Sequence, residues 1–241
     1  MDRLRTSCSN YMSILPQTQH SFPLPKKLIF WGGSGQAKVI YPIIQYYGSE
    51  VVAVIDSTVG LKSPFPGIPI IHDSEFDSWI QKTSHLGVGF CITIGNPHGQ
   101  VRINLHNKLI SLGLIPATVI HPTAWITSSA HIGLGSQIQT FAVVETESVL
   151  GIQCIVNTKA SVDHECVLGD GTEMAPGATL CGCITTEKNA WICAGATVLP
   201  RIHIGENSII GAGSVVIEDV PDNTTVIGVP AKPLIRNKNK T

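Results

Sequence analysis

One stretch of the chain, residues 120 to 220, constrains the fold more than any other. Every sixth residue in it is aliphatic except Thr186, without an insertion: Ile120, Ile126, Ile132, Ile138, Val144, Leu150, Val156, Val162, Leu168, Met174, Leu180, Ile192, Val198, Ile204, Ile210 and Val216. The residue four places after each is small or β-branched, from Ala124 to Val220. This period matches neither an α-helix nor a two-faced strand. It is typical of a β-helix in which each hexad forms one side of a triangular coil.

In such a coil the aliphatic residue points into the prism and the small residue lets the chain turn the corner. Three hexads complete a coil of eighteen residues, so the stretch predicts between five and six coils. Residues eighteen apart then stack in columns, with about 4.8 Å between successive coils.

Upstream of the hexads, predicted strands alternate with amphipathic helices, which indicates a small parallel α/β domain of the Rossmann-like class. The predicted strands are Lys27–Trp31, Val51–Ile55, Gly67–Ile71 and Val88–Ile94, and the helices 36–47, 73–81 and 99–112. We therefore expect a loose N-terminal extension (1–26), the α/β domain (27–117), the β-helix (118–220) and a C-terminal tail (221–241).

The composition excludes several partners. Charged residues make up 14% of the chain and the net charge is −1, so electrostatics favour neither nucleic acid nor an anionic membrane. No apolar run reaches the length of about 18 residues that a membrane span needs. The chain has seven cysteines, an odd number, and no two of them have the C-x-x-C spacing. They indicate packing residues and a reducing compartment, hence the cytoplasm.

A glycine turn follows the first predicted strand. Gly33, Ser34 and Gly35 open a helix, where backbone N–H groups and the helix dipole favour a phosphate. Asp56 ends the next strand, where such folds place a carboxylate against a ribose. The third fingerprint glycine is replaced by Lys38. The turn therefore indicates a nucleotide site, or alternatively only a tight connection between strand and helix.

His164 is the candidate base. It lies two residues after the inward Val162, so we expect its ring to point out of the prism. Its column reads Thr146, His164, Gly182 and Pro200, which places a glycine and its backbone N–H beside the imidazole. A base next to an open amide suits acyl transfer, because one group takes a proton and the other holds an oxyanion. Either Asp163 or Glu165 would orient the ring.

The sequence also allows predictions for the glutamates in this part of the β-helix. Glu147 stacks below Glu165, so repulsion is expected to raise the pKa of one of them. Glu173, taken alone, is expected to be a solvated charge on a coil corner. No catalytic metal is expected, since His131 and His203 share a column but are four coils apart, about 19 Å.

With these segments in place, the chain resembles the nucleotide-amino-sugar N-acetyltransferases of bacterial glycan pathways. They belong with the sialic-acid O-acetyltransferase-like proteins of the hexapeptide-repeat acyltransferases. The resemblance spans about Lys27 to Leu234 and rests on four segments: Gly33-Ser34-Gly35, 157–166, 175–178 with Gly182, and 228–232. Two positions differ from many relatives, which have histidine where this chain has Gln36 and Glu173.

The resemblance implies a left-handed β-helix, a homotrimer, acetyl-CoA in the groove between adjacent helices, and a nucleotide-linked amino sugar on the α/β domain. It implies that His164 is the general base and Glu165 its hydrogen-bonded partner. The implied acetyl-CoA contacts are Gly182, Glu173, Ala212, Val229, Pro230 and Lys232. The implied substrate contacts are Gly33, Ser34, Gly35, Asp56 and Asn157.

The predicted reaction is therefore N-acetylation of a nucleotide-linked amino sugar for a bacterial surface glycan such as lipopolysaccharide. The amine attacks the thioester directly, because Cys166 is expected to point inward and no other residue is placed as a nucleophile. Two alternatives remain at this point: a sugar O-acetyltransferase, and a non-catalytic nucleotide-binding scaffold. The low charge also favours a trimer, since flat apolar faces need partners and cyclic closure prevents open-ended assembly.

Overall fold

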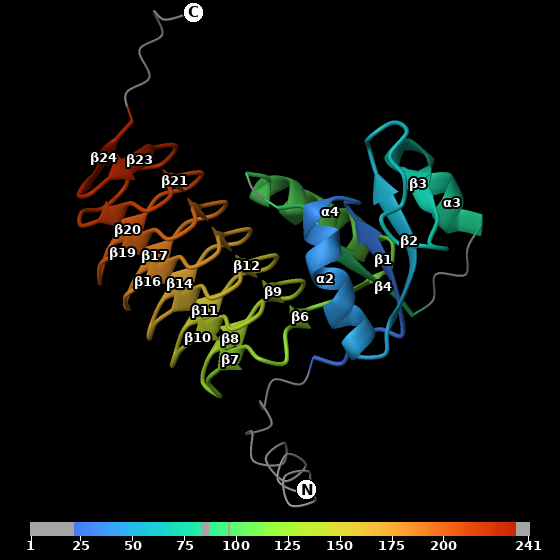
Figure 1. The fold of residues 1–241 in the computed structure, drawn as a ribbon, viewed down its shortest axis with the longest axis horizontal. Helices are drawn as coiled ribbons and strands as arrows, with labels where there is room; N and C mark the ends of the chain where they lie inside the picture. The colour runs from blue at the N-terminus through green and yellow to red at the C-terminus, as the bar shows by residue number, and fades with distance from the viewer. Residues whose placement is uncertain (1–21, 83–86, 96, 235–241) are drawn as a thin grey trace, which may run out of the picture.

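The computed structural model describes residues 22–82, 87–95 and 97–234. It shows an α/β domain beside a β-helix (Figure 1). Most of the predicted N-terminal extension (1–26) and the last residues of the predicted tail lie outside the described ranges. No helix in those ranges is long and apolar enough to cross a membrane.

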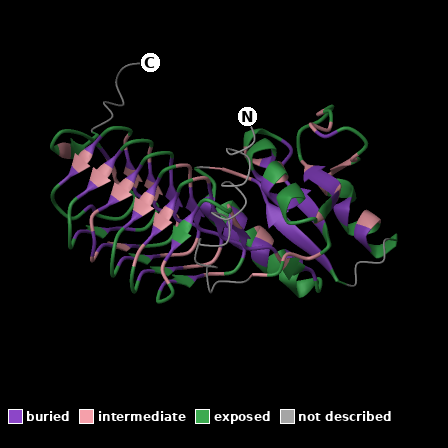
Figure 2. Ribbon diagram, turned by 60° about the horizontal axis from the view of Figure 1, so that its bottom comes forward, coloured by how far each residue is buried: buried purple, intermediate pink, exposed green. Residues whose placement is uncertain are grey.

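The α/β domain contains a five-stranded parallel sheet in the order β3-β2-β1-β4-β5. The strands are β1 (Lys27–Trp31), β2 (Glu50–Asp56), β3 (Ile70–His72), β4 (Val88–Ile92) and β5 (Ile115–Pro116), and the helices α2 (Gly35–Tyr46), η1 (Asp73–Glu75), α3 (Phe76–Lys82) and α4 (Gly99–Ser111). Apolar side chains of α2 pack on one side of the sheet, and those of α3 and α4 on the other. The central strands are buried between them (Figure 2). The strand order reverses between β1 and β4, where open α/β sheets place their ligands.

The hexads form a left-handed parallel β-helix with three faces, as predicted. Face 1 contains β6 (Val119–Ile120), β9 (Gln137–Ile138), β12 (Ile155–Val156), β15 (Glu173–Met174), β18 (Trp191–Ile192), β21 (Ile209–Ile210), β23 (Thr225–Gly228) and β24 (Ala231–Pro233). Face 2 contains β7 (Trp125–Ile126), β10 (Val143–Val144), β13 (Ser161–Val162), β16 (Thr179–Leu180), β19 (Thr197–Val198) and β22 (Val215–Val216). Face 3 contains β8 (His131–Ile132), β11 (Val149–Leu150), β14 (Val167–Leu168), β17 (Thr185–Thr186) and β20 (His203–Ile204).

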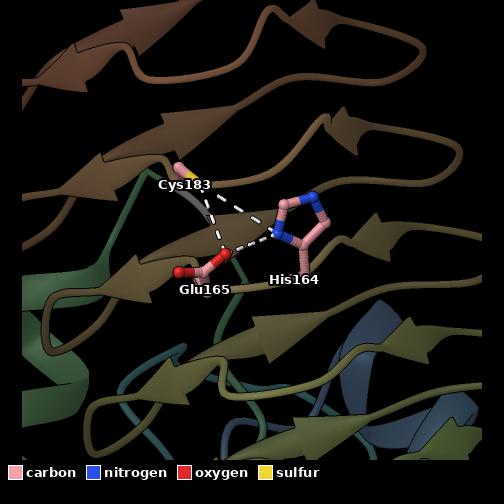
Figure 3. A group of neighbouring side chains, drawn as sticks. All are labelled: His164, Glu165 and Cys183. Carbon is pink, nitrogen blue, oxygen red and sulfur yellow. Dashed lines mark hydrogen bonds and ion pairs between the residues drawn. The ribbon is translucent and has the colours of Figure 1, made fainter.

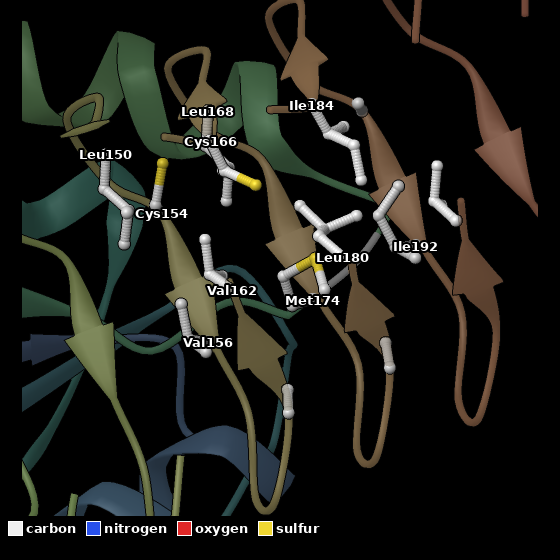
Figure 4. Close-up of a cluster of buried hydrophobic side chains, with 14 of the residues drawn as sticks. Leu150, Cys154, Val156, Val162, Cys166, Leu168, Met174, Leu180, Ile184 and Ile192 are labelled. Carbon is white, nitrogen blue, oxygen red and sulfur yellow. The ribbon is translucent and has the colours of Figure 1, made fainter. Parts of the chain in front are cut away.

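The interior of the prism is a single apolar core made of the aliphatic and small residues of the repeat (Figure 4). Strand partners are eighteen residues apart, as in the pairing of Val162 with Leu180. The polar exception, Thr186, is also buried, and its hydroxyl lies 3.0 Å from that of Thr172. The interior polar group is therefore hydrogen-bonded, which limits the free-energy penalty of burying it.

The corners of the prism impose a second six-residue pattern. From Gly135 to Gly213, every sixth residue has a positive φ: Gly135, Phe141, Glu147, Gln153, Lys159, Glu165, Gly171, Gly177, Cys183, Asn189, Gly195, Arg201, Asn207 and Gly213. Each residue with a side chain is destabilised by roughly 1–2 kcal/mol in this left-handed conformation, whereas glycine is not. Glu165 and Cys183 occupy such corners, with φ of 56° and 53°.

The α/β domain is attached to face 1 through α4. Arg102 is fully buried, and its guanidinium donates to Gly171 O at 2.7 Å and Gln153 O at 3.2 Å on the β-helix. It also donates to Ile94 O, at 3.2 Å, after β4. The helix start contributes another bond, from Gln100 N to Asn189 Oδ1 at 3.1 Å. Arg102 thus fixes the end of β4 to the coil that carries β15.

Glu173 is the charged partner of this arginine. Its Oε2 lies 3.3 Å from Arg102 Nη1, and its side chain is 8% exposed. The expectation of a solvated charge was therefore wrong. Its column lies on face 1, beneath the α/β domain, rather than on a free corner. Burial lowers the pKa of Arg102, while the Glu173 carboxylate raises it and so favours the charged pair.

We predict that Arg102→Ala destabilises the fold by about 3–5 kcal/mol, because it removes one member of a buried ion pair. Urea denaturation would measure the change. Lys232→Ala is the control, since its pair with Glu218 is exposed and such pairs contribute at most about 1 kcal/mol. A double variant, Arg102→Met with Glu173→Met, should recover part of the loss. Equal effects of Arg102→Ala and Lys232→Ala would contradict this role of Arg102.

Candidate active site

A cleft of about 500 Å³ opens at the carboxyl ends of β1, β2 and β4. Its lining includes Ser34, Gly35 and Asp56, which were predicted from sequence. Gly35 begins α2 and leaves open space where a side chain would project. The backbone N–H groups at this helix start therefore face a cavity large enough for part of a nucleotide.

Gly33 and Asp56 form the support of this cleft. Gly33 N donates to Asp56 Oδ2 at 2.7 Å, and Thr58 N donates to Asp56 Oδ1 at 2.8 Å. Gly33 itself is buried and does not line the cleft. Burial would raise the pKa of Asp56, but the two backbone hydrogen bonds, aided by His72, hold this pKa below its ordinary value. Asp56 therefore remains ionised and fixes the glycine turn.

The second group lies on the corner between faces 2 and 3, as Figure 3 shows. His164 Nδ1 is 2.9 Å from Glu165 Oε2, whereas Asp163 Oδ1 accepts from the backbone N of His164 at 2.8 Å. Glu165, and not Asp163, is thus the ring's partner. A carboxylate at Nδ1 favours the tautomer with its proton there, and leaves a lone pair on Nε2.

The other ring nitrogen faces Gly182. A Cβ built on Gly182 would lie 2.8 Å from His164 Nε2, so any other residue would crowd the ring. The column predicted from the eighteen-residue spacing is confirmed, because β13 pairs with β16 in that register. Gly182 is buried beneath the imidazole, which is itself half-exposed. The free nitrogen is consequently open to a substrate.

The pKa of Glu165 is lowered, contrary to the expectation that repulsion from Glu147 would raise a pKa in this pair. The hydrogen bond from His164 is the largest cause, followed by a hydrogen bond from the Cys183 thiol. Both contacts stabilise the ionised carboxylate.

A shallow groove of about 270 Å³ lies on face 2 next to this corner. It is lined by Val143, Glu145, Ser161, Val162, Asp163, Thr179, Leu180 and Cys181. Asp163 and Cys181 immediately precede His164 and Gly182 in the chain, so the groove lies beside the corner that carries the histidine.

Comparison with known proteins decides the family. Residues 27–109 match the PglD N-terminal domain, and residues 184–218 match the bacterial transferase hexapeptide repeat. GDP-perosamine N-acetyltransferase of Escherichia coli O157:H7 is 32% identical over 220 residues, which cover 87% of this chain and 96% of that protein. The chain belongs to the nucleotide-amino-sugar N-acetyltransferases.

Solved structures of relatives agree with this family. PerB from Caulobacter crescentus, in complex with CoA and GDP-perosamine, has a TM-score of 0.78 at 30% identity and covers 86% of this chain and 97% of its own. The acetyltransferase domain of PglB from Neisseria gonorrhoeae, in complex with acetyl coenzyme A, has a TM-score of 0.77 at 32% identity and covers 87% and 99%. The chain is thus an acetyl-CoA-dependent N-acyltransferase.

Gln36, the position where the resemblance leads one to expect histidine, lines the cleft at the ends of β1, β2 and β4. Its Nε2 donates to Gln137 Oε1 at 2.7 Å, and Gln137 Nε2 donates to Ile92 O at 2.7 Å. Gln137 is a buried residue of β9 on face 1. The two side-chain amides therefore connect the cleft, the end of β4 and the β-helix. This connection was not predicted from the sequence.

The remaining predicted residues lie elsewhere in the single chain. Asn157 and Ala212 are on the corner between faces 1 and 2, away from the corner that carries His164. Val229, Pro230 and Lys232 belong to the C-terminal hairpin of β23 and β24. Glu173 lies under the α/β domain, as described above. One chain does not bring these residues to His164.

Two sets of residues near the predicted ones were not predicted from the sequence. Cys183 Sγ lies 3.6 Å from Glu165 Oε2 and 4.0 Å from His164 Nδ1; the eighteen-residue spacing from Glu165 was the available signal. In the cleft at the ends of β1, β2 and β4, Thr93, Ile94 and His98 complete the wall after β4. Their signal was the predicted strand ending immediately before a loop and helix.

We predict a pH-dependent role of Asp56 in stability. Its pKa is lower in the fold than in the unfolded chain, where an aspartate titrates near pH ~3.9. Its stabilising contribution is therefore complete above that pH and is lost as pH falls through the folded pKa. The difference in unfolding free energy between the wild type and Asp56→Asn should be largest near neutrality and shrink below about pH 4. Urea titrations across this range would show it; a difference independent of pH would exclude it.

Proposed function

We propose that this chain transfers acetyl from acetyl-CoA to the amine of a nucleotide-linked amino sugar, with His164 as general base. The observation that carries this proposal is the fixed imidazole: Glu165 holds Nδ1 at 2.9 Å, and Nε2 faces the side-chain-free space at Gly182. A base in this state accepts a proton at Nε2 while the carboxylate stabilises the resulting imidazolium.

The reaction needs no covalent enzyme intermediate. The sugar amine attacks the thioester carbon, so that a C–N bond forms, and Nε2 of His164 takes the amine proton. Collapse of the tetrahedral intermediate breaks the C–S bond, and the imidazolium returns the proton to the CoA thiolate. Cys166 is fully buried in the core, and burial raises the pKa of its thiol. The Cys183 thiol lies at Nδ1 of His164, away from the ring nitrogen that faces Gly182.

The backbone N–H of Gly182 is the proposed oxyanion donor. Gly182 carries no side chain, and the space where a Cβ would lie is next to His164 Nε2. One such donor typically contributes about 10²–10³ in rate.

The proposed acceptor is a GDP-linked 4-amino sugar held in the α/β cleft. GDP-perosamine is the substrate named for the Escherichia coli relative and is bound in the Caulobacter structure. The start of α2, with Ser34 and Gly35, would receive the phosphates, and Asp56 and Gln36 would line the remainder of the nucleotide pocket.

The working assembly is proposed to be a homotrimer with shared sites. Asn157, Ala212 and the C-terminal hairpin lie away from the corner of His164, so a second copy is needed to bring these surfaces together. Exposed apolar side chains on the β-helix, such as Val149 and Val167 on face 3, favour partners. Light scattering at micromolar concentration should give three times the chain mass, and a monomer would contradict this assembly.

A cytoplasmic location fits the proposed reaction. The cysteines in the described ranges, Cys91, Cys154, Cys166, Cys181, Cys183 and Cys193, are all free thiols. Free thiols are typical of a reducing compartment.

We predict that His164→Ala lowers kcat by roughly 10²–10⁴ with little effect on stability, because the half-exposed ring acts in proton transfer rather than packing. Glu165→Gln should lower kcat by at least about 10-fold, since an amide can donate to Nδ1 and place the proton on Nε2. The assay would follow acetyl-CoA consumption with GDP- and UDP-linked 4-amino sugars and free sialic acid. Circular dichroism would verify folding.

The outcome separates the functions. Turnover on one nucleotide amino sugar that disappears in His164→Ala supports the proposal. Turnover only on a hydroxyl acceptor would replace it with O-acetylation, and an unaffected His164→Ala enzyme would remove the histidine from the mechanism.

A further inference from the structure

Three different ligand atoms meet at the corner beside His164. Nδ1 of His164, a carboxylate oxygen of Glu165 and Sγ of Cys183 all lie within 4.8 Å of one another. The three side chains point toward a common centre (Figure 3). Glu165 and Cys183 occupy corners of adjacent coils, eighteen residues apart, and both have a positive φ. The stacking of the coils therefore holds this cluster together.

We propose that His164, Glu165 and Cys183 form an inhibitory site for a thiophilic divalent ion, with Zn²⁺ as the best fit. The ion would bind on the Nδ1 side of the imidazole, opposite the nitrogen that faces Gly182. Its fourth ligand would be water, because His164 and Glu165 side chains are 51% and 56% exposed.

The separations agree with tetrahedral zinc. Usual zinc–ligand bond lengths of about 2.0–2.3 Å at a tetrahedral angle place two ligands roughly 3.4–3.6 Å apart. The Sγ–Oε2 distance is 3.6 Å, the Nδ1–Sγ distance 4.0 Å and the Nδ1–Oε2 distance 2.9 Å. Small side-chain rotations that lengthen the Nδ1–Oε2 distance and shorten the Nδ1–Sγ distance would bring the three atoms to these separations.

The ligand chemistry selects the kind of ion. Thiolate and imidazole favour Zn²⁺, Cd²⁺ and Co²⁺ over Mg²⁺ and Ca²⁺, which prefer oxygen ligands. Cys183 supplies the thiol, because its sulfur lies 4.0 Å from the His164 imidazole and 3.6 Å from the Glu165 carboxylate.

Binding would silence the base through its tautomer. Coordination uses the Nδ1 lone pair, so the single proton of the neutral ring moves to Nε2, and the Cys183 thiol releases its proton to solvent. A ring protonated at Nε2 cannot accept the amine proton. This inhibitory consequence rests on the proposed role of His164, whereas ion binding does not.

Cobalt absorption tests the site independently of activity. Titration of the full chain with Co²⁺ in thiol-free buffer should produce a near-ultraviolet sulfur-to-metal band at one equivalent. Cys183→Ser should abolish the band, and Cys181→Ser, the matched control on the other side of Gly182, should retain it. A missing band in the wild type, or its persistence in Cys183→Ser, would overturn the proposal.

Inhibition supplies the second readout. Zn²⁺ should inhibit acetyl-CoA consumption reversibly by EDTA, while Mg²⁺ should not. The activity of each variant with Zn²⁺ is compared with its own activity in EDTA. Cys183→Ser should raise the half-inhibitory Zn²⁺ concentration by at least about 10-fold. Even the loss of a group that only hydrogen-bonds to a metal ligand typically lowers metal affinity about 10–100-fold. An equal half-inhibitory concentration in both enzymes would overturn the inhibitory role. A cobalt band without inhibition would support the ion site and contradict the role of His164 as general base, on which the inhibition rests.

Discussion

The structure depends on the stacking register of the eighteen-residue coil. Inward aliphatic residues such as Val162 and Leu180 pair directly across adjacent coils, and a shift of one residue would turn them out of the core. The same register places Gly182 against His164 and Cys183 against Glu165. The apolar interior therefore determines the geometry of the polar corner, although no interior atom takes part in the proposed chemistry.

The second constraint is the attachment of the α/β domain to face 1. Arg102 joins Ile94, which lines the cleft of the α/β domain, to Gly171 and Glu173 on the β-helix. Gln36 and Gln137 form a parallel connection. The cleft is thus held at a fixed position relative to the coils, which suits the proposed reaction between a sugar bound in the cleft and a histidine on the β-helix.

Much of the fold was predictable because each element has a local period. The hexads gave the β-helix, and apolar runs gave β1 and β4 within two residues of their observed bounds. Glu173 and Arg102 were different, because a charged residue on a strand or helix carries no local sign of its partner 71 residues away. The left-handed corners were only partly visible: Gly and Asn mark several of them, but Glu165 and Cys183 do not look like corner residues.

The sequence by itself determined the coil, its columns and the pairing of His164 with Gly182, since these follow from a repeat of six and the spacing of strands. It also suggested a phosphate-binding turn at Gly33 to Gly35. The residues alone left Asp163 and Glu165 open as partners of the ring, the family resemblance implied Glu165, and the structure shows the Glu165 contact. Only the tertiary structure decided that Cys183 joins them and that Glu173 is buried. The physical reason is that these choices depend on side-chain direction at strained corners and on contacts between domains, which no sequence period records.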